Sequence, residues 1–175
     1  MNEDGVKRKS HLMIHDHWFS AIAIVFGYLW LASGLSKILN SEFVSGFAGL
    51  VRDEYLGENA YAWYARFLES VILPNNHLFA QLVQWGEVVI GIMLLVSGVY
   101  LLFRDSCKAH LVIAWASLGS AFLVLNIMLA EGSFLPLINF NEVFEEAVGL
   151  DMIVFLVSLV LFFGNRQEAS REKSS

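Results

Sequence analysis

Ionisable side chains inside long apolar segments are the residues of this sequence best suited to chemistry. Glu87 is the one charged residue in the apolar run 78–103, Asp151 lies inside a later apolar run, and Lys37 ends an earlier one. A charged side chain at the centre of a bilayer costs at least about 2.5–3.5 kcal/mol, so these groups are expected to face protein or water and to have partners. Carboxylates placed in this way relay protons or bind polar head groups.

The apolar segments that carry these residues predict the fold. Of the 175 residues, 57% are hydrophobic and 16% are charged, and the mean hydropathy is +0.58. A soluble domain carries about 25% charged residues, and a membrane helix needs about 20 apolar residues to cross a lipid bilayer. The sequence therefore predicts an all-α membrane protein of one domain, a four-helix transmembrane bundle. The predicted spans are 18–39, 78–103, 110–130 and 143–164.

The connection 40–77 is predicted to contain two short amphipathic helices. Apolar residues share one helical face in its first part (Phe43, Phe47, Leu50 and Val51) and in its second part (Tyr64, Phe67, Leu68, Val71 and Ile72). Helices with this pattern either lie at the membrane surface or cap the bundle. The many aromatic residues here are more typical of an interfacial belt than of a ligand site.

The distribution of basic residues predicts the orientation. With the N-terminus inside, eight basic residues lie on the inner side and three on the outer side. Because basic residues accumulate on the cytoplasmic side, the tails 1–17 and 165–175 are expected to be cytoplasmic in a protein of the plasma membrane. The connections 40–77 and 131–142 are then on the outer face. The eight inner residues are Lys7, Arg8, Lys9, Arg104, Lys108, Arg166, Arg171 and Lys173.

Polar residues of the four predicted spans concentrate in the outer half of the bundle, which predicts a shared polar pocket. Two glycine-bearing helical faces support this, because small residues let membrane helices approach closely. Packing of these two faces would bring Lys37 to Glu87, and the ammonium would hold the carboxylate ionised. The faces consist of Gly27, Trp30, Gly34 and Lys37 in the first span and of Gln84, Glu87, Gly91, Leu94 and Gly98 in the second.

Two interpretations of the polar set remain open. In one, Lys37 and Glu87 form an ion pair that only locks the bundle. In the other, the pocket binds a polar head group or relays protons. Asp151 favours the second interpretation, because one lysine cannot neutralise two carboxylates.

Several cofactor and partner classes are not expected from this chain. Its one cysteine, Cys107, cannot ligate a cluster alone, and no facing histidines or glycine-rich phosphate loop are present, so no haem, flavin or metal is expected. His11 and His15 have a metal-ligand spacing, but a solvated helix start explains them better. The pI of about 5.3, without a basic stripe, argues against nucleic acid.

Two blocks of the sequence resemble the DoxX/DoxD family of small four-helix membrane proteins. The first, GYLWLASGLSKIL, carries Gly27, Gly34 and Lys37 at the family's spacing. The second, RFLESVILPNNHLFAQLVQWGEVVIGIMLLVSGVY, has a Pro-Asn turn followed by Glu87 and Gly91. The resemblance covers about residues 20–125, with a weaker match through the last span, and implies that Lys37 and Glu87 are the family's charged residues.

The resemblance also implies a function. The DoxD branch includes the membrane subunit of thiosulfate:quinone oxidoreductase, which works with a DoxA-like subunit and passes electrons to quinone. We therefore expect a membrane subunit of a quinone-linked oxidoreductase; the alternative is a non-catalytic accessory subunit of a larger membrane complex, and a small transporter is the weaker third option. The candidate catalytic residues are Lys37, Glu87 and Asp151. The candidate quinone or substrate contacts are Trp30, Gln84, Trp85 and Asn126.

Overall fold

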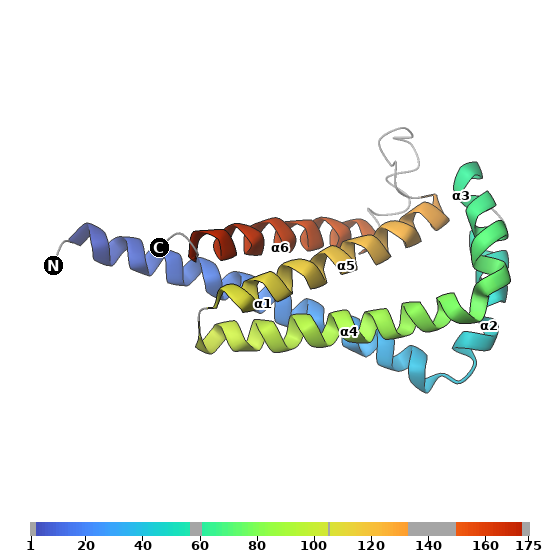
Figure 1. Cartoon of the computed structure of the whole chain (residues 1–175), viewed down its shortest axis with the longest axis horizontal. Helices are drawn as coiled ribbons and strands as arrows, with labels where there is room; N and C mark the ends of the chain where they lie inside the picture. Colours follow the sequence, from blue (N-terminus) through green and yellow to red (C-terminus); the bar gives the residue numbers. More distant parts are fainter. Residues whose placement is uncertain (1–2, 57–60, 105, 133–149, 173–175) are drawn as a thin grey trace.

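The computed structural model describes residues 3–56, 61–104, 106–132 and 150–172, and every element in these ranges is helical. Four long helices form the body of the molecule (Figure 1). They are α1 (Glu3–Leu39), α4 (Asn76–Phe103), α5 (Cys107–Glu131) and α6 (Leu150–Glu172). Each contains a segment long and apolar enough to cross a membrane, with mean hydropathy between 1.5 and 2.2. The prediction of an all-α, four-helix membrane bundle is confirmed.

The long helices pack as two pairs. α1 lies against α4, α5 lies against α6, and α4 joins the pairs through α5, whereas α1 and α6 touch much less. α1 begins and α6 ends at the same end of the bundle, which we call the tail end (Figure 1). The opposite end, where α1 and α5 finish and α4 and α6 begin, is the cap end.

Glycines bring α1 and α4 into backbone contact. A Cβ atom on Gly27 would lie 2.5 Å from the backbone nitrogen of Leu95. A Cβ atom on Gly91 would be equally close to the backbone nitrogen of Leu31. Only glycine fits where two helix backbones approach this closely. The predicted packing of the two glycine faces is therefore confirmed, and it fixes the height of α1 against α4.

Short helices form a cap over the cap end. They are α2 (Phe43–Leu50), the π-helical η1 (Val51–Tyr55), α3 (Ala62–Phe67), the π-helical η2 (Leu68–Ile72) and the 3₁₀ turn η3 (Leu73–Asn75). The first predicted amphipathic face and part of the second (Tyr64, Leu68 and Ile72) turn inward and form their own apolar cluster with the ends of α4 and α5, whereas Phe67 and Val71 of the second face are each 37% exposed. The buried members are Phe47, Val51, Tyr64, Leu68, Ile72, Ala80 and Ala130. The two segments cap the bundle, as one of the two sequence-based alternatives predicts.

The helix bounds differ from the predicted ones at both chain ends. α1 already begins at Glu3, so most of the predicted tail 1–17 is helical. α6 continues to Glu172, and Asn165 and Ala169 within the predicted tail 165–175 are buried. The polar residues after Gly164 form a further helical turn of α6 that packs on α5. Residues 143–149 of the predicted fourth span lie outside the described residues.

Candidate functional site

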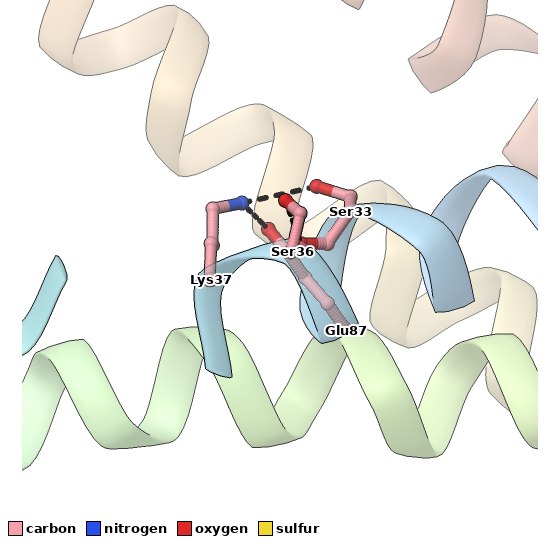
Figure 2. A network of polar contacts seen from close by, with 4 residues as sticks. All are labelled: Ser33, Ser36, Lys37 and Glu87. Carbon is pink, nitrogen blue, oxygen red and sulfur yellow. Dashed lines mark hydrogen bonds and ion pairs between the residues drawn. The ribbon is translucent and has the colours of Figure 1, made fainter. Parts of the chain in front are cut away.

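An ion pair between Lys37 and Glu87 forms the centre of the candidate site (Figure 2). The Nζ atom of Lys37 donates to Oε1 of Glu87 and, at 3.1 Å, to the hydroxyl of Ser33 one turn earlier on α1. The side chain of Glu87 is 3% exposed and that of Lys37 is 27% exposed. The pairing that the two glycine faces predict is therefore present, with the carboxylate buried and the ammonium nearer the surface.

Local packing holds both charges in place. Lys37 lies in the last turn of α1, and its ammonium lies 5.8 Å from the ring centroid of Phe43 at the start of the cap. The position of Glu87 is set by the close contact between α1 and α4. A Cβ atom on Gly34 would lie 2.8 Å from the backbone nitrogen of Val88, the residue after Glu87. At this separation a lysine that extends along α1 reaches a carboxylate on α4 directly.

The second carboxylate oxygen of Glu87 is the unusual feature of the site. Oε2 is buried, and no hydrogen-bond donor reaches it among the described residues. A buried oxygen of a charged group that lacks a donor costs at least about 1–3 kcal/mol. Native proteins keep few such groups, and each one is a candidate for a ligand, a water molecule or a catalytic role. The ammonium of Lys37 likewise uses two of its three N–H donors in the described part of the chain.

A second polar network lies deeper in the bundle and includes Trp30, a predicted quinone contact. The Nε1 atom of Trp30 donates to the hydroxyl of Ser120 over 2.8 Å, and Ser120 lies 2.8 Å from the hydroxyl of Ser158. These hydrogen bonds thus join α1, α5 and α6. The polar side-chain atom of Trp30, Nε1, is therefore already hydrogen-bonded within the bundle.

The other three predicted contact residues have different environments. Asn126 accepts a hydrogen bond of 2.9 Å from the hydroxyl of Tyr64, so it fastens the cap to α5. Gln84 is buried on the face of α4 that meets α1, one turn from Glu87. Trp85 is 55% exposed on the outside of the bundle, where a membrane places lipid. The structure therefore brings Gln84, but not Trp85, next to the ion pair.

Asp151 belongs to a separate acidic cluster at the cap end. Its described interactions are with Glu131, within reach of a side-chain hydrogen bond, and with Tyr55. Burial, followed by the nearby carboxylates of Glu131, Glu54 and Asp151, raises the pKa of Tyr55 to about 12. Among the described residues, Asp151 thus interacts with an acid and a phenol, and whether it belongs to a functional pocket stays a prediction.

The sequence-based reasoning missed a polar pair at the tail end. His110 and Asn165 are both buried, with 2.8 Å between Nδ1 of His110 and Oδ1 of Asn165. Nδ2 of Asn165 donates to the carbonyl of Leu161, so Oδ1 is the atom that faces the ring and Nδ1 carries the proton. From the sequence, His110 is expected at the inner edge of the third span and Asn165 in the C-terminal tail. The seven-residue spacing of His110 and Ser117, both buried on α5, was the available signal.

No family model matches the chain, and no curated protein or solved structure is significantly similar to it. The resemblance to the DoxX/DoxD family therefore stays a prediction. We therefore infer a function from the geometry of Lys37, Glu87 and their neighbours in a bundle of four membrane helices.

Proposed function

We propose that this chain is the membrane subunit of a quinone-linked oxidoreductase and that the Lys37–Glu87 pair binds the quinone head group. One observation carries the proposal: within the described part of the chain, no donor reaches the buried Oε2 of Glu87, and the adjacent Lys37 uses two of its three N–H donors. A donor and an acceptor side by side match a quinone oxygen in its two redox states. The carbonyl of the quinone accepts from Lys37, and the hydroxyl of the quinol donates to Glu87.

The charges of the pair suit the proton chemistry of this reaction. Quinone takes up two electrons and two protons to become quinol, and the first reduction places negative charge on the head-group oxygens. The Lys37 ammonium stabilises that charge, and Glu87, a carboxylate in the resting pair, takes up a proton from water and passes it to the same oxygen. The electrons come from a partner subunit, and the resemblance to DoxD proteins points to thiosulfate as their source.

The orientation is part of the proposal. The tail end carries the exposed residues Arg104, Lys108 and Arg166, so we place it in the cytoplasm and the cap on the outer face of the plasma membrane. Lys37 and Glu87 are then in the outer half of the bundle, closer to the cap than to the cytoplasm.

The test is thiosulfate-dependent reduction of a soluble quinone by the protein extracted with its partners in mild detergent. Glu87→Gln keeps the size of the side chain and one hydrogen bond to Lys37 but cannot accept a proton, so turnover should fall at least about tenfold. Glu69→Gln, an exposed glutamate of the cap, is the matched control and should retain turnover. Unchanged turnover of Glu87→Gln in an intact complex would remove Glu87 from any proton role.

An accessory subunit without chemistry is the second candidate function. The observation that favours it is the α1–α4 contact, because glycine packing and one buried ion pair are sufficient to lock a bundle. In that case the protein co-purifies with a larger membrane complex, and neither the native chain nor its Glu87 variants affect quinone reduction.

A further inference from the structure

The helical segment α3–η2 (Ala62–Phe67 and Leu68–Ile72), which we call the arm, runs across the end of the bundle instead of along it (Figure 1). One side of the arm packs on the cap cluster through Tyr64, Leu68 and Ile72. These residues are four apart, so they form one stripe along the helix. This stripe accounts for how the arm is attached to the protein.

A second apolar stripe lies beside the first, and the described residues leave it exposed. Trp63 is 62% exposed, and Phe67 and Val71 are each 37% exposed. Each is one residue before a buried residue, so the second stripe is rotated by about 100° from the first. The apolar side of the arm is thus roughly twice as wide as the part that the protein covers.

The remaining side of the arm is polar. Arg66, Glu69 and Ser70 are exposed there, and the hydroxyl of Ser70 donates to the carbonyl of Arg66 in its own helix. A helix with a wide apolar side and a charged opposite side is suited to the plane of a membrane surface, with its apolar side in the head-group and acyl boundary.

The chain itself indicates what covers the second stripe. The arm continues through η3 into α4, and the helical run Ala62–Phe103 contains an 18-residue stretch with a mean hydropathy of 2.2. The first turns of α4 expose Leu78, Leu82 and Trp85, which a membrane span presents to lipid. The uncovered stripe is therefore continuous along the chain with a lipid-facing helix.

We propose that the arm is embedded in the lipid leaflet at the cap end, with Trp63, Phe67 and Val71 among acyl chains and Arg66 and Glu69 toward water. The arm also carries Tyr64, which donates to Asn126 of α5. Lipid contact on one side of the arm is thereby tied to a membrane helix on the other. The proposal does not depend on the quinone function.

Nitroxide labels on the purified chain in phosphatidylcholine vesicles test this proposal. The chain has one cysteine, so Cys107→Ser, which keeps the donor to the carbonyl of Ala169, gives a background for single cysteines. Oxygen concentrates in lipid and a nickel chelate in water, so their effects on label relaxation report the surroundings. The test variants are Trp63→Cys, Phe67→Cys and Val71→Cys. The water-facing controls are Arg66→Cys, Glu69→Cys and Ser70→Cys, and Leu82→Cys on α4 is the lipid reference.

The expected result is that relaxation by oxygen exceeds relaxation by the nickel chelate several-fold at the three apolar positions, as at Leu82, with the reverse ratio at the three controls. Nickel access at Trp63, Phe67 and Val71 equal to that at Arg66 would overturn the proposal, because the stripe would then face water. Low access to both reagents would also overturn it, because a second copy of the chain would then cover the stripe. Circular dichroism of each labelled variant checks that the bundle is intact.

Discussion

The two helix pairs of the bundle are held together in different ways. α1 and α4 meet through glycines, backbone against backbone, with the Lys37–Glu87 ion pair near one end. α5 and α6 meet through side-chain hydrogen bonds at separate heights, with Ser120–Ser158 in the middle and His110–Asn165 near the tail end.

The buried polar atoms of the two pairs also differ in their partners. On the α5–α6 side, the polar atoms of Asn165 and Ser120 have partners within the protein, whereas the buried hydroxyl of Ser117 on α5 has none among the described residues. On the α1–α4 side, no donor among the described residues reaches the buried Oε2 of Glu87.

The largest effect is expected from Lys37→Met, which leaves a buried carboxylate without its cation. Removal of one partner from a buried ion pair costs about 3–5 kcal/mol, whereas the double variant with Glu87→Met should regain most of that loss. Unfolding in SDS, measured by circular dichroism, gives the double-mutant cycle. Arg171→Met breaks an exposed pair with Glu168 and should cost less than about 1 kcal/mol. A small coupling between Lys37 and Glu87 would show that the pair is not structural.

The next effect is expected from Gly91→Ala, which places a methyl group against the backbone of Leu31. The helices must separate, and overpacking of this kind costs about 1–3 kcal/mol. Gly86→Ala lies on the same helix, where the new Cβ meets only a side-chain atom of Leu123 at 3.8 Å. The control should be neutral or stabilising by up to about 1 kcal/mol. Equal stability of both variants would refute the close contact.

Asn165→Ala tests the hydrogen bonds that hold α5 against α6. It removes the acceptor of the buried His110 ring and should cost about 1–3 kcal/mol in the same SDS assay. Ser170→Ala, an exposed residue one turn further along α6, should change stability by less than about 0.5 kcal/mol. A neutral Asn165→Ala would mean that the α5–α6 pair does not depend on its hydrogen bonds.

The smallest effect concerns Tyr55 at high pH. Its pKa of about 12 in the folded chain exceeds the ordinary value of 10, so the unfolded chain loses this proton first. Stability from this group is complete below pH 10 and is lost as the pH rises toward 12. Tyr55→Phe should remove a late-titrating component from the tyrosinate absorbance. An unchanged titration curve would place Tyr55 outside the acidic cluster.

Hydropathy and helical spacing predicted the bundle and the capping helices, because these features depend on patterns within single helices. The contact of Lys37 with Glu87 was also predictable, because each residue lies on a glycine-bearing face of one of two consecutive spans. The partners of Trp30, Asn126 and Asp151 were not predictable, because they depend on how helices distant in sequence rotate against each other. His110 and Asn165 were missed for a related reason. Polar residues near a predicted membrane boundary resemble tail residues, and only the packing of α5 on α6 shows that they are buried.

The ion pair has a consequence for how the protein is made. Lys37 and Glu87 are 50 residues apart, so the ribosome finishes α1 before the partner of its charged residue exists. At about 5–20 residues per second, α1 waits roughly 2–10 seconds with its ammonium unpaired. During this time the lysine must extend toward the head groups or remain with the insertion machinery. The bundle is thus completed only after α4 is inserted, and the first helix depends on the second span for its final position in the membrane.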